Sequence, residues 1–168
     1  KHNAVLIVHM ETTAETVPAL DRALERNPAT KVIWAHQTHI KTLDGSTAQH
    51  ARMADPDQIA DLLDKYPNLY ADIAPGFASR YLRSGDGRLP DQWKDLYERY
   101  SDRFVAGLDG PFLASWEEPT GVARSATVVR NWLSNLSTPT QVKFASGNLE
   151  RILESAPSTG APCELLTK

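Results

Sequence analysis

Two histidines and an aspartate each come after a short apolar segment of the chain. His9 follows residues 4–8, His36 follows residues 31–35, and Asp109 lies just beyond residues 103–107. Neutral imidazole nitrogen and carboxylate oxygen are ligands of divalent cations such as zinc. The same groups also suit acid–base catalysis without a metal. These residue types therefore indicate a catalytic or metal site and leave the two chemistries open.

The apolar segments belong to a regular strand–helix pattern. Short apolar runs without alternation are typical of fully buried parallel strands, and they occur at residues 4–8, 31–35, 68–73 and 103–107. Apolar residues at helical spacing predict helices at residues 16–26, 55–66, 90–100, 121–136 and 141–153. This repeat predicts an α/β protein with a parallel sheet. A chain of 168 residues suits one domain, here residues 1–154, with 155–168 as a flexible tail.

Long connections follow the predicted strands, at residues 37–54, 75–89 and 109–120. In parallel α/β folds the loops at the carboxyl ends of the strands build the active site. We therefore expect His9, His36 and Asp109 to share one edge of the sheet. His39 and Arg80 lie in these loops and are candidate substrate-binding residues, because an Arg can hold a carboxylate through two hydrogen bonds. An ordinary loop histidine and a surface salt bridge are the alternatives.

Other polar and aromatic residues near the expected edge are weaker candidates for functional residues. Asp72, near the end of the third strand segment, either faces the site or anchors a loop. Trp34, Trp93 and Trp132 fall within predicted elements and are expected in the core. Trp116 lies in the loop after Asp109 and is a candidate for the wall of a pocket.

Composition narrows the range of partners. A net charge of -3 gives no broad basic surface, so we expect a small-molecule substrate and no nucleic acid. No segment approaches the ~20 apolar residues of a membrane span. The single cysteine, Cys163, provides neither a disulfide nor a CxxC zinc site. We expect a cytoplasmic protein; a periplasmic one stays open, because any leader would precede Lys1.

Several short blocks resemble consecutive blocks of the amidohydrolase superfamily, over nearly all of residues 4–153. The likeness is greatest to the amidohydrolase-related group, which includes metal-dependent decarboxylases and lactone hydrolases. The blocks are Val8-His9 with Glu11, then residues 32–36, 67–72, 102–109 and 147–153. Their order and spacing carry the resemblance.

The resemblance implies a (β/α)8 TIM barrel whose fifth to eighth strands are the four segments seen here. It implies that His9 binds a divalent metal, zinc or else manganese, and that Asp109 is both a ligand and the base acting on metal-bound water. His36 would polarise the substrate or transfer protons in a mononuclear site, and would be a ligand in a binuclear one. The implied reaction is hydrolysis of a C–N, ester or lactone bond, or decarboxylation, of a small carboxylate-bearing substrate.

The sequence departs from the family pattern at the first strand, where the superfamily has a His-x-His metal-binding pair. The nearest spacing here is His36-Gln-Thr-His39, with two residues between the histidines. A complete barrel also needs about 250 residues. We therefore expect the N-terminal half to be lost, left out or supplied by another chain. The alternative is a non-catalytic half-barrel or interaction subunit without metal, which forms a homo-oligomer to cover its open sheet edges.

Overall fold

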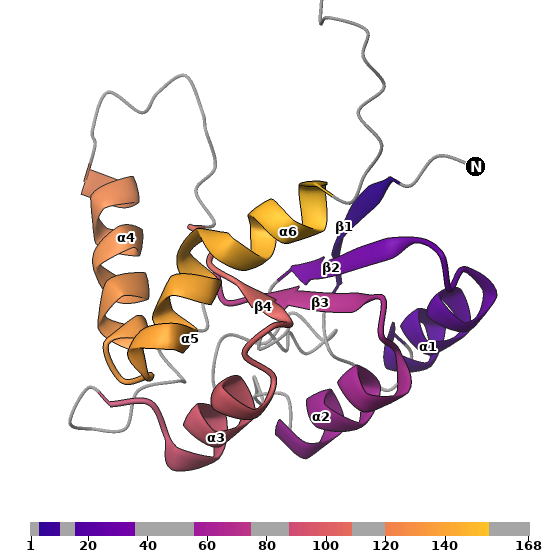
Figure 1. Ribbon diagram of the computed structural model, residues 1–168, viewed down its shortest axis with the longest axis horizontal. Coiled ribbons are helices and arrows are strands. Elements are labelled where there is room, and N and C mark those ends of the chain that lie inside the picture. The colour runs from indigo at the N-terminus through magenta and orange to yellow at the C-terminus, as the bar shows by residue number, and fades with distance from the viewer. Residues whose placement is uncertain (1–3, 11–15, 36–55, 75–87, 109–119, 155–168) are drawn as a thin grey trace, which may run out of the picture.

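The four strands form one parallel sheet in sequential order. The computed structural model describes residues 4–10, 16–35, 56–74, 88–108 and 120–154 (Figure 1). Its strands are β1 (Val5–His9), β2 (Lys31–Ala35), β3 (Leu69–Asp72) and β4 (Phe104–Val105). They lie in the order β1-β2-β3-β4, and each neighbouring pair is parallel. The predicted α/β fold with a parallel sheet is confirmed.

Helices connect and follow the strands. They are α1 (Thr16–Arg26), α2 (Pro56–Lys65), α3 (Asp91–Arg99), α4 (Thr120–Leu133), α5 (Thr138–Val142), the π-helical segment η2 (Lys143–Gly147) and α6 (Asn148–Glu154). The last three run on from one another. They begin three residues earlier than predicted, because Ser137 is extended and Pro139 suits a first helical turn. In the described segments, no helix has the length and apolar character needed to cross a membrane.

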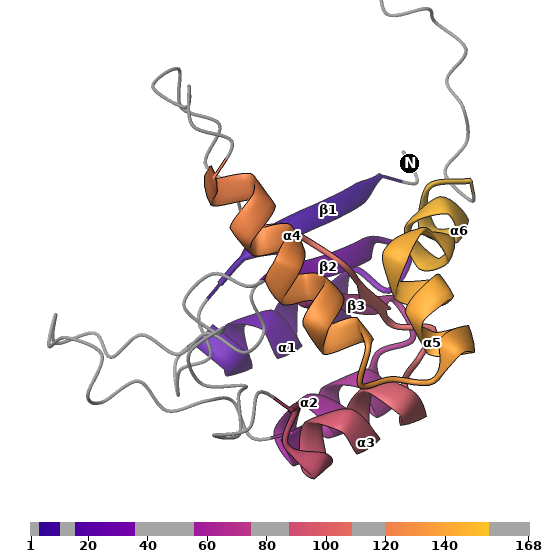
Figure 2. The same cartoon turned by 90° about the vertical axis from the view of Figure 1, so that its left-hand side faces the viewer.

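The sheet separates two clusters of buried side chains. Alternate strand residues point to opposite faces, so Trp34, Ala71 and Phe104 join the larger cluster with residues of α1 to α4. The smaller cluster on the other face consists of Ile33, Tyr70 and Val105 from the strands and Ile152 from α6. Figures 1 and 2 accordingly show α2 and α3 on one side of the sheet and α6 on the other.

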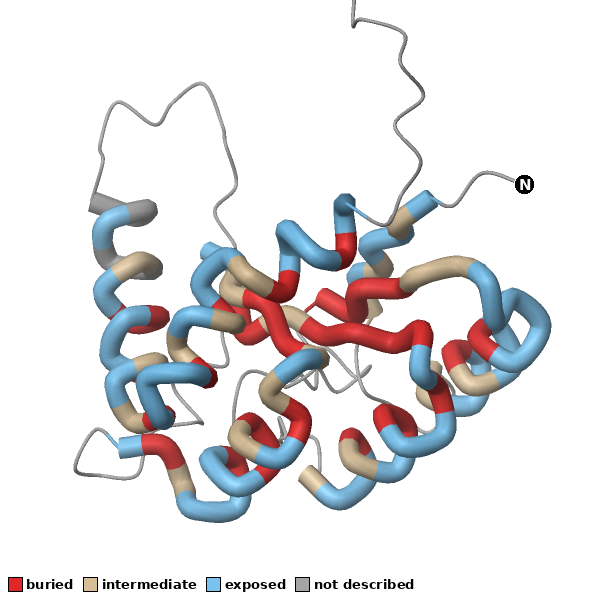
Figure 3. The backbone as a smooth tube through the Cα atoms, viewed as in Figure 1, coloured by how far each residue is buried: buried red, intermediate tan, exposed pale blue. Residues whose placement is uncertain are grey.

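Burial is greatest in the middle of the sheet and falls at β1. Figure 3 shows buried residues along β2 and β3, whereas β1 carries exposed ones. Leu6 and Ile7 of β1 are 51% and 66% exposed. The prediction that all four strands are fully buried is therefore wrong for β1. Within the described residues, β1 is an edge strand that pairs only with β2, so it has a neighbouring strand on one side alone.

Helical residues cover the opposite edge of the sheet, at β4. The buried Asn148 side chain donates hydrogen bonds from Nδ2 to the carbonyl oxygens of Phe104 (2.7 Å) and Ser101 (2.8 Å). The backbone N–H of Ala106 donates to the carbonyl oxygen of Phe144 in η2 at 2.8 Å. Backbone groups on this edge therefore bond to helical residues, which is one way proteins protect a sheet edge from further pairing.

Candidate functional site

His9 lies at the carboxyl end of the sheet. It is the last residue of β1, rather than the first residue after it, and its side chain is exposed. Its register partner in β2 is Ala35, the residue before His36. Because all four strands are parallel, the chain leaves β1, β2, β3 and β4 at this same edge.

A row of paired residues crosses the sheet at this edge. His9 pairs with Ala35, and Asp72 pairs with Val105. Trp34 pairs with Ala71, so the next residue of each strand, Ala35 in β2 and Asp72 in β3, also lies opposite the other. Neighbouring strands lie about 4.8 Å apart. His9 and Asp72 thus lie on one face roughly 10 Å apart, with the small side chain of Ala35 between them.

A buried tryptophan fixes the chain where it leaves β1. The Trp34 indole Nε1 donates a 2.7 Å hydrogen bond to the carbonyl oxygen of Met10. Trp34 is 1% exposed and packs in the larger cluster, as predicted for a core residue. His9 is therefore held to β2 in two ways, by strand pairing and by this bond to the next residue.

Asp72 anchors the chain that leaves β3 and approaches the exit of β4 closely. Its Oδ1 accepts a hydrogen bond from the backbone N–H of Ala74 at 3.1 Å, which is the loop-anchoring role considered for it. A Cβ placed on Gly107 would lie 3.4 Å from Asp72 Oδ2 and 3.2 Å from the Ala74 side chain. A side chain at residue 107 would therefore crowd the Asp72 carboxylate and the Ala74 side chain, and one of them would have to shift.

The other predicted site residues lie outside the described residues. These are His36, His39, Arg80, Trp116 and Asp109, together with most of the long loops that carry them. Among the residues that the structure describes, no group of three His, Cys, Asp or Glu side chains is placed to hold a metal ion. Of the predicted metal ligands, His9 alone falls within that part of the chain.

Two contacts of this edge were not predicted. The bond from Trp34 to Met10 joins neighbouring strands, and the Asp72–Gly107 approach joins residues that are far apart in the sequence. The glycine in Ala106-Gly107-Leu108 was a signal for the second, because a glycine at a strand end often marks a close approach of backbone.

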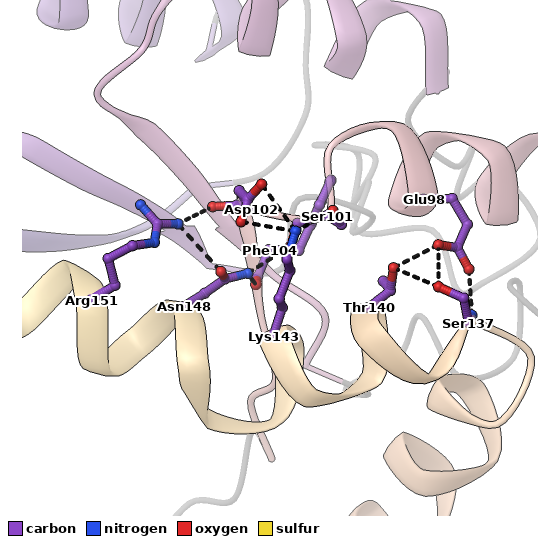
Figure 4. A network of polar contacts seen from close by, with 9 residues as sticks. All are labelled: Glu98, Ser101, Asp102, Phe104, Ser137, Thr140, Lys143, Asn148 and Arg151. Atoms are coloured by element: carbon purple, nitrogen blue, oxygen red, sulfur yellow. Dashed lines mark hydrogen bonds and ion pairs between the residues drawn. The ribbon is translucent and has the colours of Figure 1, made fainter.

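Charged groups with displaced pKa values hold helices together elsewhere. Lys65 and Tyr66 each donate a 2.7 Å hydrogen bond to Asp21 Oδ1, which holds the pKa of Asp21 below its usual value. Burial acts to raise the pKa of Glu98, but hydrogen bonds from Thr140 and Ser137 outweigh it and lower that pKa (Figure 4). These contacts join α1 to α2, and α3 to α5.

A groove of about 270 Å³ lies between α2 and α3. Its polar lining includes Asp57, Gln92 and Arg99, and no residue of the strands contributes to it. Arg99 pairs with Asp64 at 3.1 Å. The groove is therefore separate from the end of β1, where His9 lies.

Comparison with models of protein families and with curated proteins finds no match to this chain.

Proposed function

We propose that this chain supplies part of the active site of a metal-dependent hydrolase of the amidohydrolase-related type. The observation that carries the proposal is the placement of His9. It ends a parallel strand with its side chain exposed, and its register partner, Ala35, directly precedes His36. Asp109 directly follows Leu108 in the sequence, and the described chain leaves β4 at this same edge.

The strand order supports a barrel, with β1 to β4 as the fifth to eighth of its strands. Crossovers between parallel strands are right-handed. When each new strand is added on the same side of the preceding strand, all crossover helices lie on one face of the sheet. In a doubly wound sheet the direction of strand addition reverses, so helices cover both faces. Here the order does not reverse, and α1, α2 and α3 pack on one face. The opposite face, which carries His9, would line the barrel interior, with α6 packed against it near the amino end of β2.

The donor set fits a borderline divalent cation, with zinc favoured and manganese second. His9 would provide nitrogen, and Asp109 would provide oxygen and act as the base. His36 would polarise the substrate or move a proton, while His39 and Arg80 would contact a substrate carboxylate. A bound metal would lower the pKa of its water toward ~7. Hydrolysis and decarboxylation both remain compatible with these groups, and the remaining ligands would come from outside residues 1–168.

Metal analysis tests the proposal on this chain joined to the segment that supplies the remaining ligands. We expect zinc or manganese to bind stoichiometrically, and His9→Ala or Asp109→Ala to abolish that binding. His50→Ala is the matched control, because His50 belongs to no predicted constellation. The proposal would be abandoned if this completed protein bound no metal, or if its His9→Ala and His50→Ala variants bound it equally well.

One observation favours a second function, an interaction subunit that pairs through its sheet. Asn148 and Phe144 cover the β4 edge, whereas β1 has no strand partner beyond β2 in the described segments. Pairing through β1 alone joins two copies into a closed dimer and excludes head-to-tail chains. Sedimentation equilibrium would reveal a metal-independent dimer if this function holds, and a metal-free monomer would count against it.

A further inference from the structure

The chain places an arginine over a tyrosine ring at two positions, and the two pairs differ in their partners. Arg99 Cζ lies 4.9 Å from the centre of the Tyr100 ring, and Arg103 Cζ lies 5.4 Å from the centre of the Tyr70 ring. In the first pair, Arg99 forms an ion pair with Asp64 at 3.1 Å, and the Tyr100 hydroxyl donates to a backbone carbonyl of α2 at 3.4 Å. The polar groups of that pair therefore have acceptors within the chain.

The hydroxyl of Tyr70 has no such acceptor. Tyr70 is the second residue of β3 and is 7% exposed, yet its hydroxyl has no hydrogen-bond partner in the segments that the structure describes. A buried tyrosine hydroxyl usually finds one. Because Ala71 pairs with Phe104, Arg103 lies opposite Tyr70 on the neighbouring chain. A buried donor without an acceptor thus lies beside a guanidinium group.

The Arg103 guanidinium is half-buried and bonds to carbonyl oxygens rather than to a carboxylate. Its Nε donates to the Leu69 carbonyl at 2.8 Å, and its Nη2 donates to the carbonyls of Leu69 and Tyr66. Within the described ranges, its Nη1 has no acceptor and no carboxylate lies at ion-pair distance. Burial is the main cause that lowers the pKa of Arg103, and the charge of Arg151 acts in the same direction. Arg103 thus keeps free donors and an unbalanced positive charge, which is costly when partly buried.

We propose that Tyr70 and Arg103 bind an oxyanion, the carboxylate or phosphate group of a ligand. The oxyanion would accept hydrogen bonds from the Tyr70 hydroxyl and from Arg103 Nη1, because planar guanidinium donors match carboxylate and phosphate oxygens. The positive charge of Arg151 favours an anion here. Lys31 adds a further positive charge on the same face of the sheet, where its Nζ lies 3.0 Å from the Ile152 carbonyl.

This site is separate from the proposed metal site and does not depend on it. Arg103 directly precedes β4, so the oxyanion would lie toward the amino end of the sheet, whereas His9 ends β1 at the carboxyl edge. Tyr70 belongs to the smaller buried cluster, together with Ile152 of α6. The inference therefore gives a second, binding role to the face that α6 packs against.

NMR titration of the isotope-labelled whole chain tests the inference. The probes are sodium phosphate and sodium acetate, each compared with sodium chloride at equal ionic strength. We expect at least one of the two oxyanions to shift the backbone amide signals of Tyr70 and Arg103 to saturation, and chloride not to do so. Preference for acetate would assign a carboxylate ligand, and preference for phosphate a phosphate ligand.

Tyr70→Phe isolates the hydroxyl, because the ring and its contacts remain. We expect it to weaken oxyanion binding about 10-fold or more, the usual effect of losing a hydrogen bond to a charged group. Tyr100→Phe is the matched control, since it removes a buried tyrosine hydroxyl from the opposite face of the sheet. Arg103→Lys should also weaken binding, whereas Arg99→Lys should not.

Three results would overturn the inference. Shifts of equal size with chloride, or none with either oxyanion, would show that no oxyanion site exists. Wild-type affinity in Tyr70→Phe would show that the hydroxyl is not a donor to the ligand. Equal losses in Tyr70→Phe and Tyr100→Phe would show a non-specific effect. Thermal melting checks the fold of each variant, and if Arg103→Lys fails to fold because its carbonyl contacts are lost, the comparison of the two tyrosine variants decides.

Discussion

The indole Nε1 of Trp34 donates a 2.7 Å hydrogen bond to the carbonyl oxygen of Met10, the residue after His9. This bond ties the exit of β1 to the buried centre of β2, where Trp34 is 1% exposed. A histidine at the end of an edge strand would otherwise be held by strand pairing alone. The backbone around His9 is therefore better fixed than its exposed position suggests.

Removing this bond should destabilise the protein. In Trp34→Phe the aromatic ring remains, but the Met10 carbonyl loses its donor. We expect a loss of about 1–3 kcal/mol in the free energy of unfolding, from the lost hydrogen bond and the smaller ring. Urea denaturation followed by circular dichroism measures it.

Trp93→Phe is the matched control for this loss. Trp93 is equally buried, but its Nε1 has no hydrogen-bond acceptor in the part of the chain that the structure describes. The same change in ring size should therefore cost less, by about 1 kcal/mol, than at Trp34. Equal losses in the two variants would contradict a stabilising role for the Met10 bond.

Asn148→Ala should be strongly destabilising. The Asn148 side chain is fully buried and donates to the carbonyl oxygens of Ser101 and Phe104. Its removal leaves a buried carbonyl without a donor and opens a cavity, which should cost about 2–4 kcal/mol in unfolding free energy. The exposed Val142 provides the comparison, because Val142→Ala should change stability by no more than about 0.5 kcal/mol. Similar losses in both variants would argue against the role of Asn148 as an edge cap.

Acid should weaken the contact between α3 and α5. The hydrogen bonds from Thr140 and Ser137 hold the pKa of Glu98 below its ordinary value of 4.5. A carboxyl whose pKa is lower in the folded state stabilises the fold above its unfolded pKa, and this stability is lost as the pH falls through the folded pKa. The wild type should therefore lose more stability than Glu98→Gln as the pH falls from 7 toward 3. Parallel stability curves for the two proteins would refute this linkage.

Ile7→Lys should reduce association without unfolding the chain. Ile7 is 66% exposed on the edge strand, so a lysine there should change the unfolding free energy by no more than about 0.5 kcal/mol. Its register partner Ile33 is buried, and Ile33→Ala should cost about 2–5 kcal/mol. Light scattering at increasing concentration measures the association. An unchanged concentration dependence in Ile7→Lys would exclude β1 as the associating edge.

Local patterns predicted β2, α1 and α2 well, because β2 is a continuous apolar run and the apolar residues of α1 and α2 lie at helical spacing. They failed where distant contacts decide the structure. β4 is two residues long, because beyond it Ala106 donates its N–H to Phe144 rather than to a strand. Composition also cannot distinguish an edge strand from a central one, so the exposure of Leu6 and Ile7 was not predicted.

Of the candidate site, local sequence predicted the position of His9 but not the contacts around it. The position of His9 at a strand end follows from local sequence, because a histidine directly after an apolar run marks the strand's end. The approach of Asp72 to Gly107 depends on the register between β3 and β4, which short-range patterns do not encode. The π-helical turn that carries Phe144 likewise has no local sequence signature that we can identify.

The face of the sheet that carries the smaller buried cluster is covered late in synthesis. Lys31 at the start of β2 donates a hydrogen bond from Nζ to the carbonyl oxygen of Ile152 in α6 at 3.0 Å, across 121 residues. At about 5–20 residues per second, a ribosome needs roughly 6–24 s to make the intervening chain. During that time the Ile33 side of β2 has no α6 to cover it. The nascent chain thus carries an apolar surface that chaperones can bind until its C-terminal helix emerges.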